Sequence, residues 1–185
     1  MDDQRIKNDL RDVLYTEEQL QKRVEEMGEM ISRDFAGENV ILVGILKGAV
    51  MFFADLARAI SIPVQMDFMA ITSYGTATKS SGVVRILKDL DHDITGRNVI
   101  IVEDIVDSGT SLSFLKDNLI SRGAKSVSVC VLLDKPDRRR MHVDVNYRGF
   151  SIPDEFVVGY GLDYAEMYRE LPVIGILKEE VYSSN

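Results

Sequence analysis

The sequence has little of several features that would assign a protein to a specialised class. Its 185 residues include one cysteine, Cys130, so neither an intramolecular disulfide nor a cysteine-based metal cluster can form. No apolar run approaches the roughly 18 residues of a membrane span, and the polar start MDDQRIKNDL contains no apolar core of a secretory signal. We therefore expect a cytoplasmic protein without a membrane partner, in which Cys130 is a buried, unreactive thiol.

Basic residues and histidines are also scarce. Thirty acidic side chains against 22 basic ones give a formal net charge of −8, which disfavours general binding to nucleic acid. The two histidines, His92 and His142, lack ligand-like spacing, and no role is assigned to them. A composition of 45% hydrophobic and 28% charged residues excludes disorder and low-complexity arrays. An anionic ligand would have to be held locally, by loops and metal ions.

Apolar runs and helical spacings alternate along the chain. Thr16–Gln19 reads as a capping box, and apolar residues at spacings of three and four then predict a helix that ends at Gly37. A second helix is expected over 49–60 and a third from about 112 to Gly123. Strands are predicted at 40–45, 64–71, 83–87, 98–102, 126–133, 156–160 and 173–177, and a mobile loop at 73–82, SYGTATKSSG.

This alternation predicts an α/β fold with a mostly parallel central sheet flanked by helices on both faces. No repeat, linker or change in composition marks a second domain, so residues 1–185 are expected to form one domain with a core of roughly 38–140. The segments before and after that core fit the alternation poorly. We expect them to form a small subdomain, or hood, over the strand ends.

The segment 99–112 carries the most specific chemistry. The apolar strand VIIV is followed by Glu103 and Asp104, and then by DSGTS, which opens a helix. Backbone N–H groups and hydroxyls at a helix start can hold a phosphate, and ligands of open α/β sheets bind at the carboxyl ends of strands. The adjacent acids would repel a bare phosphate, but they suit a ligand with free hydroxyls or a bridging Mg²⁺. A phosphorylated sugar meets both conditions, and the alternative is an acidic turn with Asp107 or Ser108 as N-cap.

At these residues the chain resembles a known family. VEDIVDSGTSL resembles the 5-phosphoribosyl 1-diphosphate motif of the phosphoribosyltransferases. Together with GILKG, SYG, LLDKP and IPDEFVVGYGLDYAEMYRELP, it makes residues 10–183 similar to the small bacterial members that act on hypoxanthine and guanine. The resemblance implies the type I phosphoribosyltransferase fold, Mg²⁺ as cofactor, and a homodimer or homotetramer.

The resemblance also implies a role for residues at each end of the sugar substrate. The loop GILKG would bind diphosphate through Lys47 and Gly48, often with a non-proline cis peptide before the lysine, and Arg169 would contact the same group. Metal and ribose hydroxyls would be held by Glu103 and Asp104, with Asp163 near a second Mg²⁺. The 5′-phosphate would lie against Ser108, Gly109, Thr110 and Ser111, and a lid would include Ser73 and Tyr74. The alternative for Arg169 is a surface arginine paired with a nearby acid.

For the base, the resemblance implies a second group of residues. Lys135 would donate to the 6-oxo group of a purine, and an ammonium, which only donates, would reject an exocyclic amine. Phe156 would stack on the purine, the backbone at Val157 would pair with its edge, and Asp163 would lie nearby. Asp107 is the candidate base for the purine ring proton. The alternative for Lys135 is an ordinary surface lysine, and the run Arg138–Arg140 is expected to be a solvated face.

The sequence therefore predicts a purine salvage enzyme, a glycosyltransferase that converts hypoxanthine or guanine and phosphoribosyl diphosphate to IMP or GMP and diphosphate. Two other functions remain open at this point. One is an RNA-binding regulator of a pyrimidine operon with the same fold, against which the charge of −8 argues. The other is a nucleotide-binding module without catalytic activity.

Overall fold

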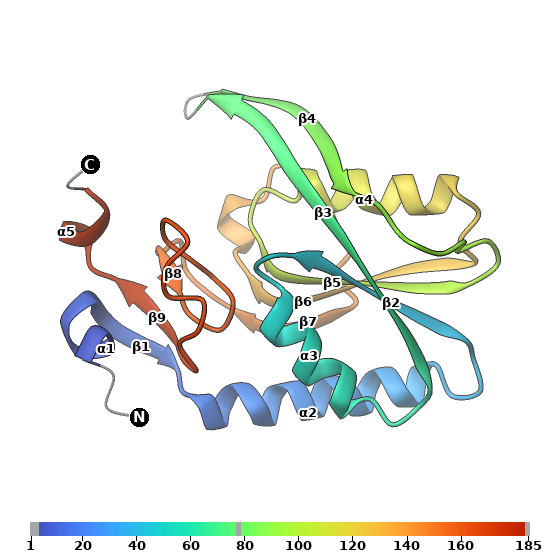
Figure 1. Ribbon diagram of the computed structural model, residues 1–185, viewed down its shortest axis with the longest axis horizontal. Helices are drawn as coiled ribbons and strands as arrows, with labels where there is room; N and C mark the ends of the chain where they lie inside the picture. The colour runs from blue at the N-terminus through green and yellow to red at the C-terminus, as the bar shows by residue number, and fades with distance from the viewer. Residues whose placement is uncertain (1–3, 77–78, 184–185) are drawn as a thin grey trace.

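A six-stranded sheet forms the centre of the molecule (Figure 1), and its strand order is β4-β3-β2-β5-β6-β7. The computed structural model describes residues 4–76 and 79–183, without the side chains of residues 5–7 and 73–83. Neighbouring strands are parallel except for the antiparallel pair β3 and β4. The strands are β2 (Val40–Leu46), β3 (Val64–Thr76), β4 (Lys79–Lys88), β5 (Asn98–Val106), β6 (Ser126–Asp134) and β7 (Tyr147–Ser151). The predicted α/β class with a mostly parallel sheet is confirmed.

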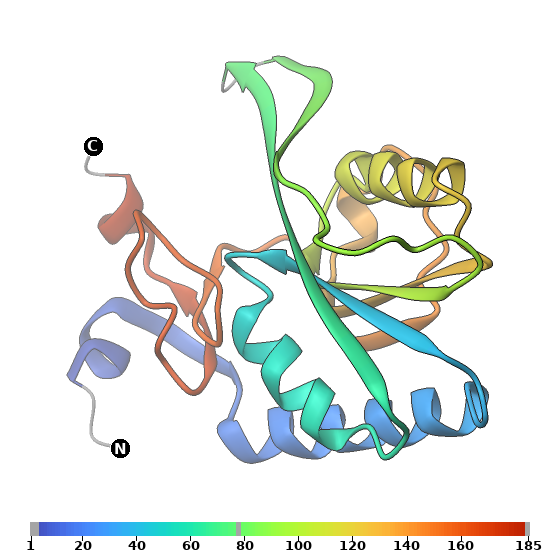
Figure 2. The ribbon, with the colours of Figure 1, turned by 45° about the vertical axis from the view of Figure 1, so that its right-hand side comes forward.

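Helices cover both faces of this sheet. Helices α2 (Glu17–Asp34) and α3 (Val50–Ala59) lie along one face, and α4 (Thr110–Ser121) lies on the opposite side, as Figures 1 and 2 show. Alternate residues of the central strands therefore enter two separate cores, one with the apolar residues of α2 and α3 and one with those of α4. The predicted capping box starts α2: the Gln19 amide donates to the Thr16 hydroxyl, and the Gln19 side chain accepts from the Thr16 amide.

The two ends of the chain meet in a second, smaller sheet. Strands β1 (Leu10–Tyr15), β9 (Ile174–Leu177) and β8 (Val157–Val158) pair antiparallel in that order. The short helices α1 (Gln4–Asp9) and α5 (Glu179–Tyr182) flank it, at the left of Figure 1. We refer to this part as the small sheet. The strand expected at 156–160 is shorter than predicted because Gly159, Tyr160 and Gly161 have positive φ and end it.

The segment expected to be a loop at 73–82 is mostly strand, so that prediction is wrong. Strands β3 and β4 continue as an antiparallel hairpin, with register from Ala70 opposite Lys88 to Thr76 opposite Lys79. Backbone hydrogen bonds between two strands need no apolar side chains, which is why a polar, glycine-flanked sequence can pair in this way. Residues 77 and 78 of the predicted loop lie outside the described part of the chain.

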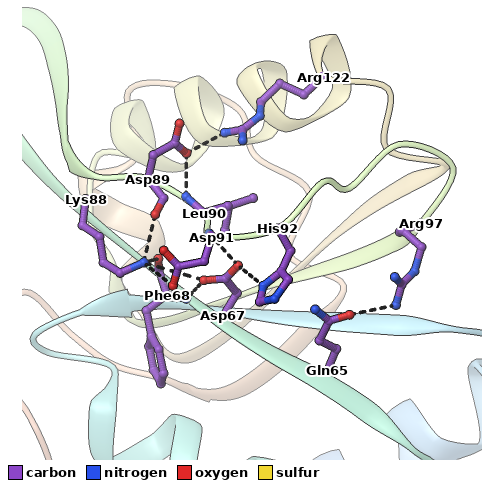
Figure 3. Close-up of polar contacts among 10 residues, drawn as sticks. All are labelled: Gln65, Asp67, Phe68, Lys88, Asp89, Leu90, Asp91, His92, Arg97 and Arg122. Atoms are coloured by element: carbon purple, nitrogen blue, oxygen red, sulfur yellow. Dashed lines mark hydrogen bonds and ion pairs between the residues drawn. The ribbon is translucent and has the colours of Figure 1, made fainter.

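A buried carboxylate ties the base of this hairpin to the loop after β4 (Figure 3). The Asp67 side chain is 3% exposed and accepts hydrogen bonds from the amides of Phe68, at 2.7 Å, and Asp91, at 3.0 Å. His92 Nδ1 lies 3.4 Å and Lys88 Nζ 3.7 Å from its oxygens. Burial raises the pKa of Asp67, but the hydrogen bonds and the lysine charge outweigh burial and hold the pKa below its ordinary value.

No helix in residues 4–76 and 79–183 is both long enough and apolar enough to cross a bilayer. Cys130, in β6, is fully buried, as the sequence predicted, and burial raises the pKa of its thiol. A buried neutral thiol of this kind packs as a small apolar side chain.

Candidate active site

A cavity of about 370 Å³ lies at the carboxyl ends of β2 and β5, where the sheet faces the start of α4 and the loop after β8. Open α/β sheets bind their ligands at this position. The polar and glycine residues that line the cavity are Lys47, Gly48, Glu103, Asp104, Asp107, Ser108, Gly109, Ser111, Asp163 and Arg169. Most residues that the sequence assigned to the phosphoribosyl site are thus brought together. Thr110, at the first turn of α4, is not among the lining residues.

The loop after β2 brings its backbone close to the acids of β5. The Leu46–Lys47 peptide is cis, as the resemblance implied. A Cβ on residue 48 would overlap the Asp104 carboxylate, so only glycine allows the two segments to approach this closely. The Lys47 ammonium lies 2.8 Å from Glu166 in the loop after β8. The loop therefore presents backbone groups to the cavity, and its lysine is held at the rim.

Glu103 and Asp104 lie within β5 and not after it, which corrects the expected end of this strand. Glu103 is in register with Val131 of β6, and the pairing continues to Val106 because β5 is enclosed between two parallel neighbours. Burial raises the pKa of Glu103 well above its ordinary value, and the charge of Asp104 adds to this effect. The pKa of Asp104 is also raised by burial. Two adjacent, partly buried carboxylates repel each other unless a cation is shared between them.

Such a pair fits Mg²⁺, which is held in many phosphate-binding enzymes by one or two carboxylates, with water and substrate oxygens completing the coordination shell. Among the described residues, no group of three or more Asp, Glu, His or Cys side chains is placed to hold a metal. Asp163, the third residue assigned to metal binding, is already engaged: Oδ1 pairs with Arg169 at 2.9 Å and Oδ2 accepts from the Glu166 amide at 2.9 Å.

The phosphate loop, residues 107–111, turns from β5 into α4. Gly109 is the N-cap of α4 and has φ +82°, so the alternative that Asp107 or Ser108 occupies the N-cap position is wrong. The Ser108 carbonyl accepts from the amides of Arg140 and Met141, each at 2.9 Å. These bonds fix the loop from outside. At the start of α4 the Thr110 amide donates to the Ser108 hydroxyl at 3.4 Å, and the N–H groups that follow in the first turn are of the kind that can bind an anion.

Lys135 follows β6 and is not a surface lysine. Its side chain is 12% exposed, and Nζ donates to the Glu155 carbonyl at 2.7 Å and lies 3.6 Å from Asp154. The ammonium is thus held beside the segment that leads into Phe156. It does not line the cavity described above, so the assigned base site extends from that cavity towards the small sheet.

Phe156 has one face covered and still remains 40% exposed. Its ring stacks on Tyr182 of α5, with centroids 5.0 Å apart and planes at 23°, and Tyr164 meets its edge at 5.8 Å. The next residue, Val157, is buried in β8 opposite Ile176. A ring with one face packed and the other in solvent can accept a flat ligand. The contribution of Tyr182 was missed because no pattern connects these two positions in the sequence.

Arg169 is held over the cavity by the loop after β8. Its Nη1 donates to the Gly161 carbonyl at 2.8 Å and pairs with Asp163 at 2.9 Å, while Glu166 lies 3.4 Å from Nη2. The buried Nε has no hydrogen-bond partner within the described residues. The predicted surface pair with Glu166 exists, but the guanidinium also lines the cavity, where its shape suits a phosphate oxygen pair.

The expected solvated face at 138–140 is wrong for Arg139, whose side chain is 19% exposed and pairs with the buried Asp134. Arg138 is half exposed but pairs with two carboxylates, one of them Asp107. Only Arg140 is exposed without a side-chain partner in the described structure. The pairs of Arg138 and Arg139 were missed because both depend on a turn of three residues, the 3₁₀ helix Pro136–Arg138, that the pattern does not predict.

Comparison with known proteins agrees with this arrangement. The chain is 56% identical over 180 residues to a hypoxanthine-guanine phosphoribosyltransferase of Mycobacterium tuberculosis, covering 94% of this chain and 89% of that protein. It is 49% identical to that of Streptococcus agalactiae, over 96% and 99% of the two chains. The crystal structure of a hypoxanthine phosphoribosyltransferase from Staphylococcus aureus superposes on all of both chains with a TM-score of 0.95 and 47% identity.

A family model described as the phosphoribosyl transferase domain matches residues 11–165, which include the loop after β2, the two acids of β5 and the phosphate loop. The match thus covers the described residues that line the cavity except Arg169. The central sheet and the cavity at its carboxyl edge are therefore those of the phosphoribosyltransferase family, to which this chain belongs.

Proposed function

We propose that this chain transfers the 5-phosphoribosyl group of phosphoribosyl diphosphate to hypoxanthine or guanine, forming IMP or GMP and releasing diphosphate. The observation that carries the proposal is one cavity in which a phosphate loop, a close-packed glycine loop and two adjacent carboxylates face one another. An RNA-binding regulator is not favoured, because relatives that match nearly the whole chain are hypoxanthine-guanine phosphoribosyltransferases.

The sugar substrate occupies the cavity. Its 5′-phosphate lies against the amides and hydroxyls of residues 108–111, at the start of α4. Its diphosphate lies against the backbone of Lys47 and Gly48, with Arg169 donating from the other side. Glu103 and Asp104 hold Mg²⁺ and the ribose hydroxyls. When bound, Mg²⁺ neutralises the diphosphate and orients the sugar.

The purine lies next to the cavity, between the core and the small sheet. The exposed face of the Phe156 ring stacks on the purine, the backbone at Val157 pairs with the edge of the purine, and Lys135 donates to the 6-oxo group. A purine ring nitrogen forms the new bond to the anomeric carbon of the ribose while the bond to diphosphate breaks. Asp107 accepts the proton that this ring nitrogen loses. Asp163 lies near the base, where its pair with Arg169 links the two halves of the site.

The parts of the molecule around the site have roles of their own in the proposed reaction. The small sheet acts as the hood of a single domain, and the β3–β4 hairpin, which contains Ser73 and Tyr74, acts as a lid that excludes water. The enzyme works in the cytoplasm as a homodimer or homotetramer on small molecules, without nucleic acid or membrane as partner. These statements stay predictions.

The experiment that tests the function is a set of initial rates with hypoxanthine, guanine, xanthine and adenine at fixed phosphoribosyl diphosphate, with Mg²⁺ or with excess chelator. We expect IMP and GMP formation that requires the metal, and little turnover of adenine. Binding of nucleotide without turnover would identify a non-catalytic module instead. Full activity in chelator, with metal-free substrate, would contradict the assignment of Glu103 and Asp104.

A further inference from the structure

Arg138 joins two carboxylates that belong to different parts of the site. Its Nε donates to Asp107 Oδ1 at 3.1 Å, and its Nη1 donates to Asp154 Oδ2 at 3.1 Å. Asp107 directly follows β5, the strand that carries the acid pair, whereas Asp154 lies in the segment before β8. One guanidinium therefore connects the phosphate loop with the segment that leads to the purine platform.

The same chain of charges continues to the purine donor. Asp154 Oδ1 lies 3.6 Å from Lys135 Nζ, which in turn donates to the Glu155 carbonyl. Three ion pairs thus form a connected series of alternating charge: Asp107, Arg138, Asp154 and Lys135. The two ends of this series are Asp107, the proposed proton acceptor, and Lys135, the proposed donor to the 6-oxo group.

The backbone around Arg138 is fixed well enough for its side chain to restrain the Asp107 carboxylate. It ends the 3₁₀ helix Pro136–Arg138, and the amides of Arg140 and Met141 anchor the following residues to the Ser108 carbonyl. The guanidinium therefore starts from a backbone already fixed to the phosphate loop. Its bond engages Oδ1 of Asp107, and among the described residues no other donor contacts that carboxylate. The second oxygen of Asp107 remains open while the first is restrained.

We propose that Arg138 is a positioning residue that orients the Asp107 carboxylate towards the purine ring nitrogen. Through Asp154, it also fixes the position of this carboxylate relative to the Lys135 ammonium. This inference rests on the proposed function, since it concerns the same proton acceptor. All three side chains of the Arg138 pairs are about half exposed. Exposed ion pairs contribute little to folding, so the effect should appear in turnover and not in stability.

The test compares Arg138→Ala with Arg140→Ala, which removes the same charge two residues away from a side chain without a described partner. Both variants lose equal long-range attraction for a polyanionic substrate, so their difference isolates the contact with Asp107. We expect Arg138→Ala to lower kcat about tenfold relative to Arg140→Ala, below the roughly 10²-fold loss that a 1 Å misplacement can cause. The KM for phosphoribosyl diphosphate should be the same in both, and Arg138→Lys, which keeps one donor, should recover part of the rate.

A double-mutant cycle separates this role from a general loss of activity. In an Asp107→Asn background, Arg138→Ala should lower the rate no further, because the group through which it acts is already gone. Equal kcat for Arg138→Ala and Arg140→Ala, or an undiminished effect in the Asp107→Asn background, would overturn the proposal. Failure of the proposed function is distinguishable, since the unmodified enzyme would then show no turnover at all.

Discussion

Lys135 offers the most direct test of how the site selects its base. Its side chain is 12% exposed, and the ammonium donates to the Glu155 carbonyl. In the proposed complex it also donates to the purine 6-oxo group. Losing a charged donor to a buried acceptor costs about 1.5–3 kcal/mol, which is roughly a 10- to 150-fold loss in affinity. We therefore expect Lys135→Ala to lower kcat/KM for hypoxanthine and guanine by that factor.

The assay is the initial rate of IMP and GMP formation at saturating phosphoribosyl diphosphate, with the KM for that substrate measured in parallel. That KM should stay unchanged, because Lys135 does not line the phosphoribosyl cavity. Lys125→Ala is the matched control, since its ammonium is half exposed and pairs with Glu38 far from the proposed base site. Melting temperatures show whether the freed Glu155 carbonyl destabilises the fold. Unchanged constants for both bases would refute the role of Lys135, and an equal loss for phosphoribosyl diphosphate would point to general disruption.

Three further predictions follow from the geometry. Asp107→Asn should slow nucleotide formation about 10²–10⁴-fold in steady-state assays while the melting temperature stays unchanged, since Asp107 is not a helix cap; near-normal turnover would remove it as the base. Gly48→Ala should raise the KM for phosphoribosyl diphosphate about tenfold, because its Cβ would overlap Asp104 and displace the loop; an unchanged KM would show that the approach is not needed. Asp67→Asn should cost about 1–3 kcal/mol in denaturant unfolding at neutral pH. Because the folded-state pKa of Asp67 is lowered, its carboxylate stabilises the fold above the unfolded pKa of about 4, and this stabilisation is lost as the pH falls through the folded value. The variant should therefore lose less stability than the unmodified protein on acidification. Parallel stability profiles against pH would contradict this.

The helices and buried strands of the core could be predicted because local pattern and tertiary packing agree there. The capping box at Thr16 starts α2 where expected, and the apolar run from Val40 forms β2, enclosed on both faces. Elements that depend on distant partners could not be placed in this way. Strand β1 pairs with β9 across almost the whole chain, and β7 is defined by its pairing with β6. Their sequences carry too little periodicity to indicate a strand on their own.

The prediction for the β3–β4 hairpin was wrong for a related reason. Composition predicted a loop because residues 73–82 are small and polar, but antiparallel pairing depends on the partner strand and not on side-chain burial. The same limit applies to β5, in which Glu103 and Asp104 are strand residues despite their charge. Strand neighbours on both sides impose extended geometry on acids that would otherwise favour a turn.

For the site, residue types at motif spacing identified the cavity lining but not the contacts among its members. The resemblance assigned Gly48 to diphosphate binding, yet only the fold shows that its backbone lies against the Asp104 carboxylate. The bonds from Arg138 to Asp107 and Asp154 span 31 and 16 residues and arise from a short 3₁₀ turn after β6. No periodicity or propensity specifies which carboxylate an exposed arginine meets, because several acids lie within reach of so long a side chain.

The charges around the cavity explain why acids and a phosphate loop can coexist in one site. Its described lining contains four carboxylates, Glu103, Asp104, Asp107 and Asp163, against two cations, Lys47 and Arg169. Both cations are already paired with acids of the loop after β8, so the lining on its own is unfavourable for a polyanion. Burial raises the pKa of Glu103 and Asp104, so the charged forms of these two carboxylates are disfavoured. Under the proposed function, a divalent cation relieves both problems at once, since it offsets the buried acid pair and the diphosphate in the same place. A chain with net charge −8 can then bind a polyanion without a basic surface, and it binds one that carries its own cation more favourably than one that does not.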